Sequence, residues 1–221
     1  MTMQSNIADN LQKIQQQLGK TQLIAVSKTH PVSTLEEAYE AGCRVFGENK
    51  VQEMVQKYEA LPKDIQWHLI GHLQTNKVKY IAPFVHLIHS VDSLKLLQEI
   101  NKQGLKNQRV INCLLQIHIA QEETKFGFSF EEAEALLSPT LPTDLPAVKI
   151  VGCMGMATNT NDAAQVRQEF AALRHFFLEQ KARLGATFSE LSMGMSQDYA
   201  IAIAEGSTMV RIGSAIFGVR S

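Results

Sequence analysis

The sequence predicts one α/β domain over residues 1–221, a single (β/α)8 TIM-type barrel with an extra N-terminal helix and no final helix. Eight short apolar runs alternate with segments of helical periodicity, which is the pattern of repeated βαβ units around a parallel sheet. Most runs are nearly continuous in apolar residues, as expected of parallel strands covered on both faces. The turn after the first run, VSKTHP, lacks the glycines that usually follow the first strand of an open doubly wound sheet, so a closed barrel is favoured.

The first half of the chain shows this alternation clearly. An opening helix over about 5–18 carries apolar residues at helical spacing from Ile7 to Leu18 and ends at Gly19. Proline and serine begin the next helical segment and a glycine closes it, which separates two strand-like runs. In this half we expect strands over 23–28, 43–49, 65–71 and 85–91, and further helices over 31–41, 50–61, 76–81 and 93–103.

The second half continues the pattern with a long strand and a long helix. Ser129 is a suitable N-cap for the helix after the fifth strand, and the proline-rich residues 139–146 form a predicted loop. The longest helical segment carries a stripe of large apolar residues, which is typical of a face packed on a core. In this half we expect strands over 109–120, 148–158, 188–194 and 208–218, and helices over 130–137, 162–184 and 196–204. The opening helix is expected to cover the side of the last strand.

Composition indicates a soluble cytoplasmic protein. Hydrophobic residues make up 45% of the chain and charged residues 19%, and the formal net charge is -1. A nucleic-acid-binding protein would usually carry a basic stripe, and an anionic membrane would attract a polybasic run; neither is visible. The N-terminal residues lack the apolar core of a signal peptide, and no apolar run reaches the ~18 residues of a membrane span. Cys43, Cys113 and Cys153 form no C-x-x-C motif, so neither a disulfide framework nor a thiolate zinc site is expected.

Polar residues recur where the predicted strands end, which is where the active site of such a barrel lies. Lys28 and Asn49 end the first two strands, and His68, His89 and His118 lie near the ends of the next three. The histidines show no metal-ligand spacing on a helix, so no metal site is expected. The remaining polar candidates come from the last two strands.

The ends of the last two strands predict an anion site. Gly213 and Ser214 follow the eighth strand, and Ser196 is placed to cap the helix after the seventh. The loops after strands seven and eight commonly bind phosphate in such barrels, because main-chain N–H groups are exposed there. Simpler roles remain open for two of them, with Ser196 as a helix cap and Gly213 as the site of a bulge. We therefore expect a ligand that carries a phosphate.

Lys28 is the candidate nucleophile. A lysine at the end of an apolar strand is partly removed from water, which lowers the pKa of its amine and lets it condense with a carbonyl group. The plain alternative is a surface lysine just past a strand. A phosphate site near an imine-forming lysine predicts pyridoxal 5'-phosphate (PLP) as the cofactor, and it also permits a Schiff-base aldolase for a sugar phosphate.

Arg211 helps to decide between these ligands. Its alternation with neighbouring apolar residues aims it at one face of the eighth strand, where it could hydrogen-bond a pyridine nitrogen. Arginine does not readily lose a proton, so the ring nitrogen would stay neutral and the ring would be a weak electron sink. The structural alternative for Arg211 is an ion pair with Glu48 or Glu205. Asn49 likewise has a plain alternative as a turn residue.

Five motifs make the sequence resemble one known family. They are AVSK (25–28), FGEN (46–49), WHLIG (67–71), LSMGMS (191–196) and GSTMVRIGSAIFG (206–218). In this order they resemble the pyridoxal phosphate homeostasis protein family, which is similar to the barrel domain of bacterial alanine racemases. The resemblance covers nearly the whole chain and implies a PLP-binding barrel.

The resemblance also implies a role for each residue of the site. The lysine would hold PLP as a Schiff base, the two serines and the glycine would bind its phosphate, and the arginine would face the pyridine nitrogen. The asparagine would lie near the ring hydroxyl, and the methionine stands where the family commonly has leucine. The implied cofactor-binding residues are Lys28, Asn49, Met193, Ser196, Arg211, Gly213 and Ser214.

The family implies a PLP carrier that serves intracellular PLP homeostasis and supply with little or no catalytic turnover. The alternative is a racemase-like enzyme of the same barrel type. Two-base racemisation needs an acid–base group on each face of the ring, and alanine racemases take a tyrosine from a second domain. The chain ends at Ser221, so we expect that tyrosine to be absent. A sugar-phosphate aldolase would need a carboxylate or a second lysine beside the first as a proton shuttle, and none is evident at the predicted rim.

The expected partners are PLP itself and apo-enzymes that receive it. No nucleic acid and no membrane is expected among them, and the protein is expected to be a monomer or a weak homodimer.

Overall fold

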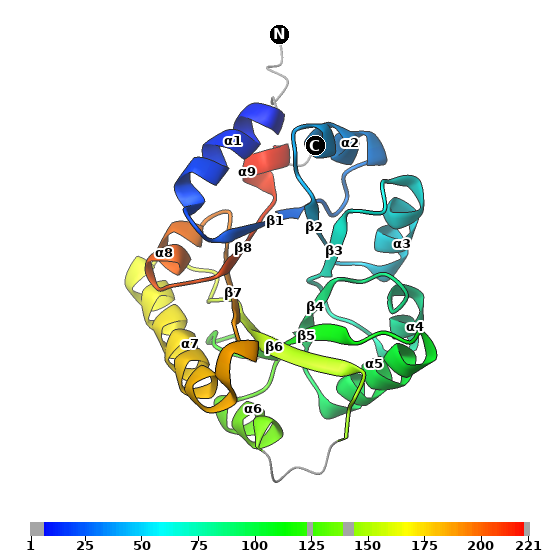
Figure 1. Ribbon diagram of the computed structural model, residues 1–221. Coiled ribbons are helices and arrows are strands. Elements are labelled where there is room, and N and C mark those ends of the chain that lie inside the picture. The colour runs from blue at the N-terminus through cyan, green and yellow to red at the C-terminus, as the bar shows by residue number, and fades with distance from the viewer. Residues whose placement is uncertain (1–6, 123–125, 139–143, 219–221) are drawn as a thin grey trace.

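The computed structural model describes residues 7–122, 126–138 and 144–218. Within these ranges eight parallel strands close into a barrel in chain order, with β1 hydrogen-bonded to both β2 and β8 (Figure 1). The predicted fold class is thereby confirmed. The strands are β1 (Gln22–Val26), β2 (Val45–Glu48), β3 (Gln66–Leu69), β4 (Leu87–Val91), β5 (Ile111–Ile117), β6 (Val148–Gly155), β7 (Glu190–Met195) and β8 (Met209–Ile212).

Helices surround the barrel, and serine side chains cap the starts of two of them, one of which is the predicted Ser129. Ser93 accepts from the Leu96 N–H at the start of α5, and Ser129 forms a capping box with Glu132 at the start of α6. The helices are α1 (Ile7–Leu18), α2 (Val32–Glu40), α3 (Val51–Ala60), α4 (Val78–Ile81), α5 (Leu94–Lys106), α6 (Phe130–Leu137), α7 (Ala163–Leu184), α8 (Tyr199–Ala204) and α9 (Ser214–Phe217), with short 3-10 segments at Thr75–Lys77 and Gly185–Thr187.

The first and last helices lie side by side on one flank of the barrel (Figure 1). The Asn10 side chain in α1 donates to the Ile216 carbonyl in α9 at 2.9 Å, as expected for an opening helix that covers the last strand. The sequence predicts a strand that runs to Gly218 with no final helix. In the structure β8 ends at Ile212, and the single helical turn α9 follows it. The turn begins because the Gly213 carbonyl accepts from two later N–H groups instead of from a neighbouring strand.

The barrel wall separates two apolar clusters. The larger one fills the space between the strands and the surrounding helices. The smaller one is made by inward-facing residues of the strands, Ile24, Leu87, Leu114, Val151, Met154 and Met209. His89, Gln116 and Arg211 each lie two residues beyond a member of the smaller cluster on the same strand, and all three are buried. The interior is therefore apolar toward the strand N-termini and polar toward the C-termini.

Three further observations concern the class of protein. None of the helices in the described ranges has both the length and the apolar character that crossing a bilayer requires. Cys43, Cys113 and Cys153 are each a buried thiol outside any disulfide, and burial raises their pKa values. Across the described residues, no group of three or more histidines, cysteines and carboxylates is placed to hold a metal ion.

Candidate functional site

Lys28 lies in the turn just after β1, two residues beyond Val26, and is partly buried. The residue before it, Ser27, is fully buried. The residue after it, Thr29, has a φ of 69°, in the left-handed region that β-branched residues rarely adopt. The residue before Lys28 is thus buried. The residue after it has an unfavourable backbone conformation, which contacts from other parts of the chain must hold.

A buried ionic group holds this turn, and we call it the Lys57 cluster: Lys57, Glu48 and Glu53. The Lys57 ammonium donates to the Ser27 carbonyl at 2.8 Å, to Glu48 Oε1 at 2.7 Å and to Glu53 Oε1 at 2.7 Å. Ser27 Oγ also donates to Glu48 Oε1 at 2.6 Å. With three acceptors, every N–H of the ammonium is used. Lys57 is therefore a structural cation and not a second nucleophile.

Burial and ion pairing shift the pKa of Glu48 in opposite directions. Its side chain is 0% exposed, and removal from water raises the pKa of the carboxyl group. The neighbouring Lys57 charge and the hydrogen bonds from Lys57 and Ser27 lower that pKa and offset part of the rise. The ion pair with Lys57 therefore offsets the cost of burying the Glu48 carboxylate.

Asn49 follows β2 and is held against the loop after β3. A Cβ atom on Gly71 would lie 2.5 Å from the Asn49 carbonyl oxygen and 2.9 Å from its Cβ, so only glycine fits there. The Ile70 N–H also donates to the Glu48 carbonyl at 2.9 Å. The motifs FGEN and WHLIG thus meet at the ends of two neighbouring strands, and their glycine-to-asparagine contact fixes the backbone of Asn49.

The predicted phosphate residues come together at the ends of β7 and β8. The Gly213 N–H donates to Ser196 Oγ at 3.3 Å, and Ser214 is exposed at the first position of α9. A Cβ atom on Gly213 would lie 3.0 Å from the Val26 carbonyl oxygen, so this glycine packs against the end of β1. That contact brings the loop after β8 within two residues of Lys28.

Ser196 does not cap the helix after β7, which corrects the sequence prediction. The helix α8 begins at Tyr199, and its N-cap is Asp198. The Asp198 carboxylate accepts from the Met195 N–H at 2.5 Å, which closes a turn over residues 196–198 before the helix starts. Ser196 lies in that turn, and its hydroxyl oxygen accepts from Gly213.

Arg211 is 4% exposed and lies inside the barrel. Its Nη1 donates to Ser192 Oγ at 2.6 Å and to the Ser192 carbonyl at 3.0 Å, and its Nη2 donates to the Gly155 carbonyl at 3.1 Å. The predicted alternative, a pair with Glu48 or Glu205, is not seen, since Glu48 pairs with Lys57 and Glu205 with Arg167. Burial lowers the pKa of Arg211 to about 10, so the guanidinium keeps its charge at neutral pH.

Two buried histidines extend from Arg211 across the barrel, and we call these four residues the histidine–arginine chain: His68, His89, Ser192 and Arg211. His89 Nδ1 lies 3.0 Å from Ser192 Oγ, and His89 Nε2 lies 2.9 Å from His68 Nδ1. Arginine only donates, so the Ser192 oxygen accepts from Arg211 and its own hydrogen is available for His89 Nδ1. His89 Nε2 then carries the proton that His68 Nδ1 accepts.

Burial keeps both histidines of this chain neutral. It lowers the pKa of His68 to about 3, with a smaller contribution from the charge of His86, and it lowers the pKa of His89 well below its ordinary value. Two neutral rings therefore orient the serine that holds the arginine. His72, four residues after His68, bonds to Asp92 at 3.0 Å, so these two histidines share no ligand.

The side chain of Met193, another predicted site residue, lies outside the barrel interior. It is 0% exposed and belongs to the cluster between the strands and the helices. Ser192 points into the barrel toward Arg211, so its neighbour points outward. The main chain of Met193 is bonded to Ser207, whose hydroxyl donates to the Met193 carbonyl at 2.8 Å.

Sequence reasoning missed three residues that shape the site: Glu53, Lys57 and Ser192. A weak signal existed for Lys57, because it shares a helical face with the buried residues Val51 and Met54. A lysine on an apolar stripe is unusual and calls for a buried partner. Ser192 carried no such signal, since its partners are 19 and 103 residues away in sequence.

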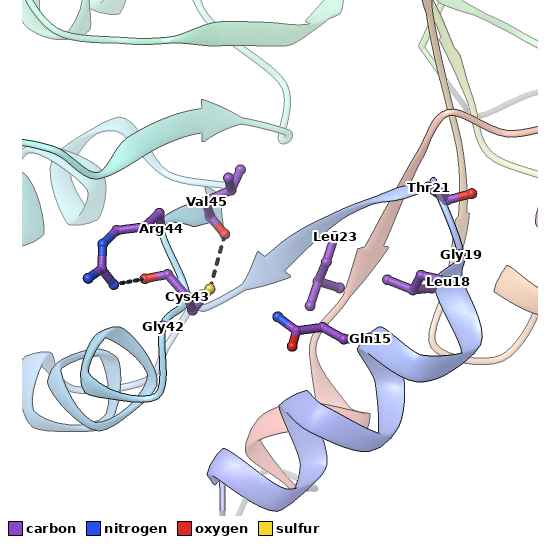
Figure 2. A pocket seen from close by; sticks show the side chains of 9 residues that line it. All are labelled: Gln15, Leu18, Gly19, Thr21, Leu23, Gly42, Cys43, Arg44 and Val45. Carbon is purple, nitrogen blue, oxygen red and sulfur yellow. Dashed lines mark hydrogen bonds between the residues drawn. The ribbon is translucent and has the colours of Figure 1, made fainter.

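Two hollows lie near the N-terminal ends of the barrel strands, away from the predicted site. One, of about 330 Å³, lies between α1 and the starts of β1 and β2, and Figure 2 shows Gln15 and Leu23 across from Cys43 and Arg44. The other, of about 370 Å³, is lined by residues at the strand N-termini, among them His86. Neither hollow includes a predicted PLP residue.

Comparison with known proteins assigns the family. Residues 3–221 match the family described as alanine racemase, N-terminal domain. A pyridoxal phosphate homeostasis protein of Aquifex aeolicus is 41% identical over 98% of this chain and 96% of that protein. One of Schizosaccharomyces pombe is 39% identical over 90% of this chain and 84% of its own length.

Solved structures agree with this assignment. PipY of Synechococcus elongatus PCC7942 without PLP has a TM-score of 0.90 and 39% identity, over 96% of this chain and all of PipY. PipY with PLP bound has a TM-score of 0.86 and 38% identity over the same shares. An alanine racemase from Bartonella henselae shares the barrel fold, with a TM-score of 0.73 and 19% identity over 97% of this chain and 58% of the racemase. This chain therefore belongs to the pyridoxal phosphate homeostasis proteins of the alanine racemase N-terminal domain family.

Proposed function

We propose that this protein binds PLP as a Schiff base on Lys28 and serves intracellular PLP supply in the cytoplasm with little or no catalytic turnover. The contact between Gly213 and Val26 carries the proposal, because it joins the predicted phosphate site at the end of β8 to the turn that holds the lysine. The relative PipY, solved with PLP bound at 38% identity, supports the choice of cofactor.

The residues at the ends of β7 and β8 suit a phosphate. Ser196 and Ser214 offer hydroxyl groups, and Gly213, which has no side chain, lets their loop lie against the end of β1. The Ser214 side chain is exposed, so binding an anion there requires little rearrangement. Asn49 comes from the neighbouring side of the mouth, where its backbone is fixed by Gly71 and its amide would meet the ring hydroxyl.

Arg211 has enough N–H donors to bind a pyridine nitrogen in addition to its protein partners. A guanidinium has five N–H donors, and within the described residues Arg211 uses three of them on Ser192 and Gly155. Two donors remain at the polar end of the barrel interior, and the histidine–arginine chain keeps them in place. Because the guanidinium stays charged, it donates to the ring nitrogen and leaves that nitrogen unprotonated.

Lys28 supplies the covalent bond. PLP brings an aldehyde, and a neutral primary amine condenses with it to form a C=N bond and release one water. Lys57, the other lysine beside this turn, donates all three N–H groups to fixed acceptors and has no lone pair to offer. The two lysines therefore have separate functions, with Lys28 as the nucleophile and Lys57 as the support of its turn.

The racemase-like alternative is less well supported by the residues around the mouth. Racemisation needs an acid–base group on each face of the ring. In the described ranges the tyrosines lie on the outer helices α2, α3, α4 and α8, and the Tyr199 hydroxyl donates to Gln17 of α1. An unprotonated ring nitrogen next to Arg211 also disfavours carbanion formation, which supports a carrier.

The test is a spectrum followed by chemical trapping. The purified chain incubated with PLP should show the imine band at the violet edge of the visible range. After borohydride reduction, peptide mapping should place the cofactor on Lys28 alone. Lys28→Ala should lose both signals, while Lys50→Ala, at an exposed lysine one residue past Asn49, should keep both.

Two outcomes would overturn the proposal. Trapping of PLP on another lysine, or no trapping in the wild type, would remove Lys28 from its role. Rapid interconversion of D- and L-alanine by the isolated wild type would replace the carrier function by a racemase.

A further inference from the structure

We propose that the Lys57 cluster positions Lys28, and that Glu53 and Lys57 set how fast and how completely PLP becomes attached to that lysine. The inference rests on the proposed function, since it names residues that act on the same lysine. In the proposed site none of the three cluster members contacts the cofactor. Their effect passes through the backbone on either side of Lys28.

The contacts of the cluster bracket Lys28 along the chain. Before it, the Ser27 carbonyl accepts from Lys57 at 2.8 Å and the Ser27 hydroxyl donates to Glu48 at 2.6 Å. After it, the Thr29 N–H donates to Glu53 Oε1. Main-chain groups on both sides of the lysine are thus held by side chains from β2 and α3.

The conformation held in this way is one that the chain would not favour by itself. Thr29 has a φ of 69°, and a β-branched residue in this region persists only when the surroundings hold it there. Its N–H donates to Glu53, and the His30 N–H also closes the turn by donating to the Ser27 carbonyl at 3.1 Å. Loss of the bond to Glu53 would let Thr29 relax to an extended conformation and would turn the Lys28 side chain away from the mouth.

Glu53 and Lys57 are also coupled to each other. Lys57 Nζ lies 2.7 Å from Glu53 Oε1 one helical turn earlier, so the oxygen that accepts from Thr29 is itself fixed by the ammonium. Lys57 in turn is fixed by Glu48, whose side chain is fully buried. The cluster therefore holds the turn around Lys28 in a fixed position relative to α3 and β2. A fixed position of this kind is what pre-organises a nucleophile.

The experiment compares Glu53→Ala with Glu53→Gln. Glu53 is the least buried member, with a side chain 22% exposed, so both variants should fold. Alanine removes the acceptor for Thr29, and glutamine keeps an oxygen in its place. Glu59→Ala, on the exposed side of the same helix, removes the same charge without touching the turn and is the matched control.

The readouts are the rate of appearance of the imine band with PLP and the fraction of PLP trapped by borohydride. Binding of pyridoxamine 5'-phosphate is measured in parallel, because this probe carries the ring and the phosphate without an aldehyde. In Glu53→Ala the imine should form about tenfold more slowly or less completely. Pyridoxamine 5'-phosphate should bind as in the wild type, and Glu53→Gln should restore most of the imine rate.

Lys57→Met is a second variant, read in the same way if it folds. Equal imine rates and trapped fractions in Glu53→Ala and wild type would overturn the inference while leaving Lys28 as the attachment site. A loss of pyridoxamine 5'-phosphate binding equal to the loss of imine would also overturn it, since the whole mouth would then have changed. Absence of an imine in the wild type would instead contradict the proposed function.

Discussion

The two polar networks of the barrel compensate their charges in different ways. In the Lys57 cluster an ammonium meets two carboxylates, and its members lie within ten positions of one another, on β2 and α3. The histidine–arginine chain links β3, β4, β7 and β8, and its one cation is bonded to neutral oxygens. The first network depends on keeping its charges paired. The second depends on keeping its histidines uncharged.

Breaking the ion pair of the Lys57 cluster should have the largest effect on stability. Lys57→Met leaves Glu48 at 0% exposure without its cation, and removal of one partner of a buried pair costs about 3–5 kcal/mol in free energy of unfolding. The double variant Lys57→Met/Glu48→Gln removes the charge as well and should recover more than half of that loss. Urea unfolding of the wild type, both single variants and the double variant measures the coupling.

The coupling energy between Glu48 and Lys57 tests whether their two charges compensate each other. If the losses of the two single variants simply add in the double variant, Glu48 and Lys57 do not compensate each other, and the description of this cluster as an ion pair is wrong.

Much of the fold was accessible from sequence because it follows from local patterns. Alternating apolar runs and helical segments predict the barrel, and the polar residues after the strands are all brought to one end by the parallel arrangement. This is why Lys28, Asn49 and Gly213 were placed at the correct strand ends. Their roles toward PLP remain proposals.

The remaining parts depend on distances that only the folded chain sets. Lys57 reaches the Ser27 carbonyl 30 residues away because α3 packs beside β2 and β3, and β2 pairs with β1. Ser192 meets Arg211 only after β7 pairs with β8. Met193 was assigned to the site by its motif, although alternation with Ser192 directs its side chain to the outer cluster. A motif identifies a segment, and the strand register decides which of its side chains face the barrel interior.

The histidine–arginine chain should make stability depend on pH. In the unfolded chain a histidine titrates near ~6.5, whereas burial lowers the pKa of His68 to about 3 and also lowers that of His89. The unfolded state therefore binds more protons below pH ~6.5, so stability falls as the pH drops. Each histidine should remove up to about 1.4 kcal/mol per pH unit below the pKa of the unfolded chain.

The measurement compares the pH slope of wild type and His68→Gln between pH 7.5 and 5.5 by urea unfolding. The variant should have a slope shallower by up to one proton, since its glutamine does not titrate. Glu48 acts in the opposite direction because burial raises the pKa of its carboxyl, and this contribution cancels in the difference between the two proteins. Identical slopes would show that His68 takes up a proton in the folded barrel.

Ser214 belongs to neither network, so it should separate binding from stability. Its side chain is exposed at the start of α9, and Ser214→Ala should change the free energy of unfolding by no more than about 0.5 kcal/mol. A hydrogen bond to a charged phosphate is worth about 1.5 kcal/mol or more, so the Kd for PLP should rise about tenfold. Ser33→Ala, at an exposed serine of α2, is the control and should change neither quantity. If Ser214→Ala left the Kd unchanged, the phosphate would have to be held elsewhere, and the contact of Gly213 with β1 would then serve only to close the barrel.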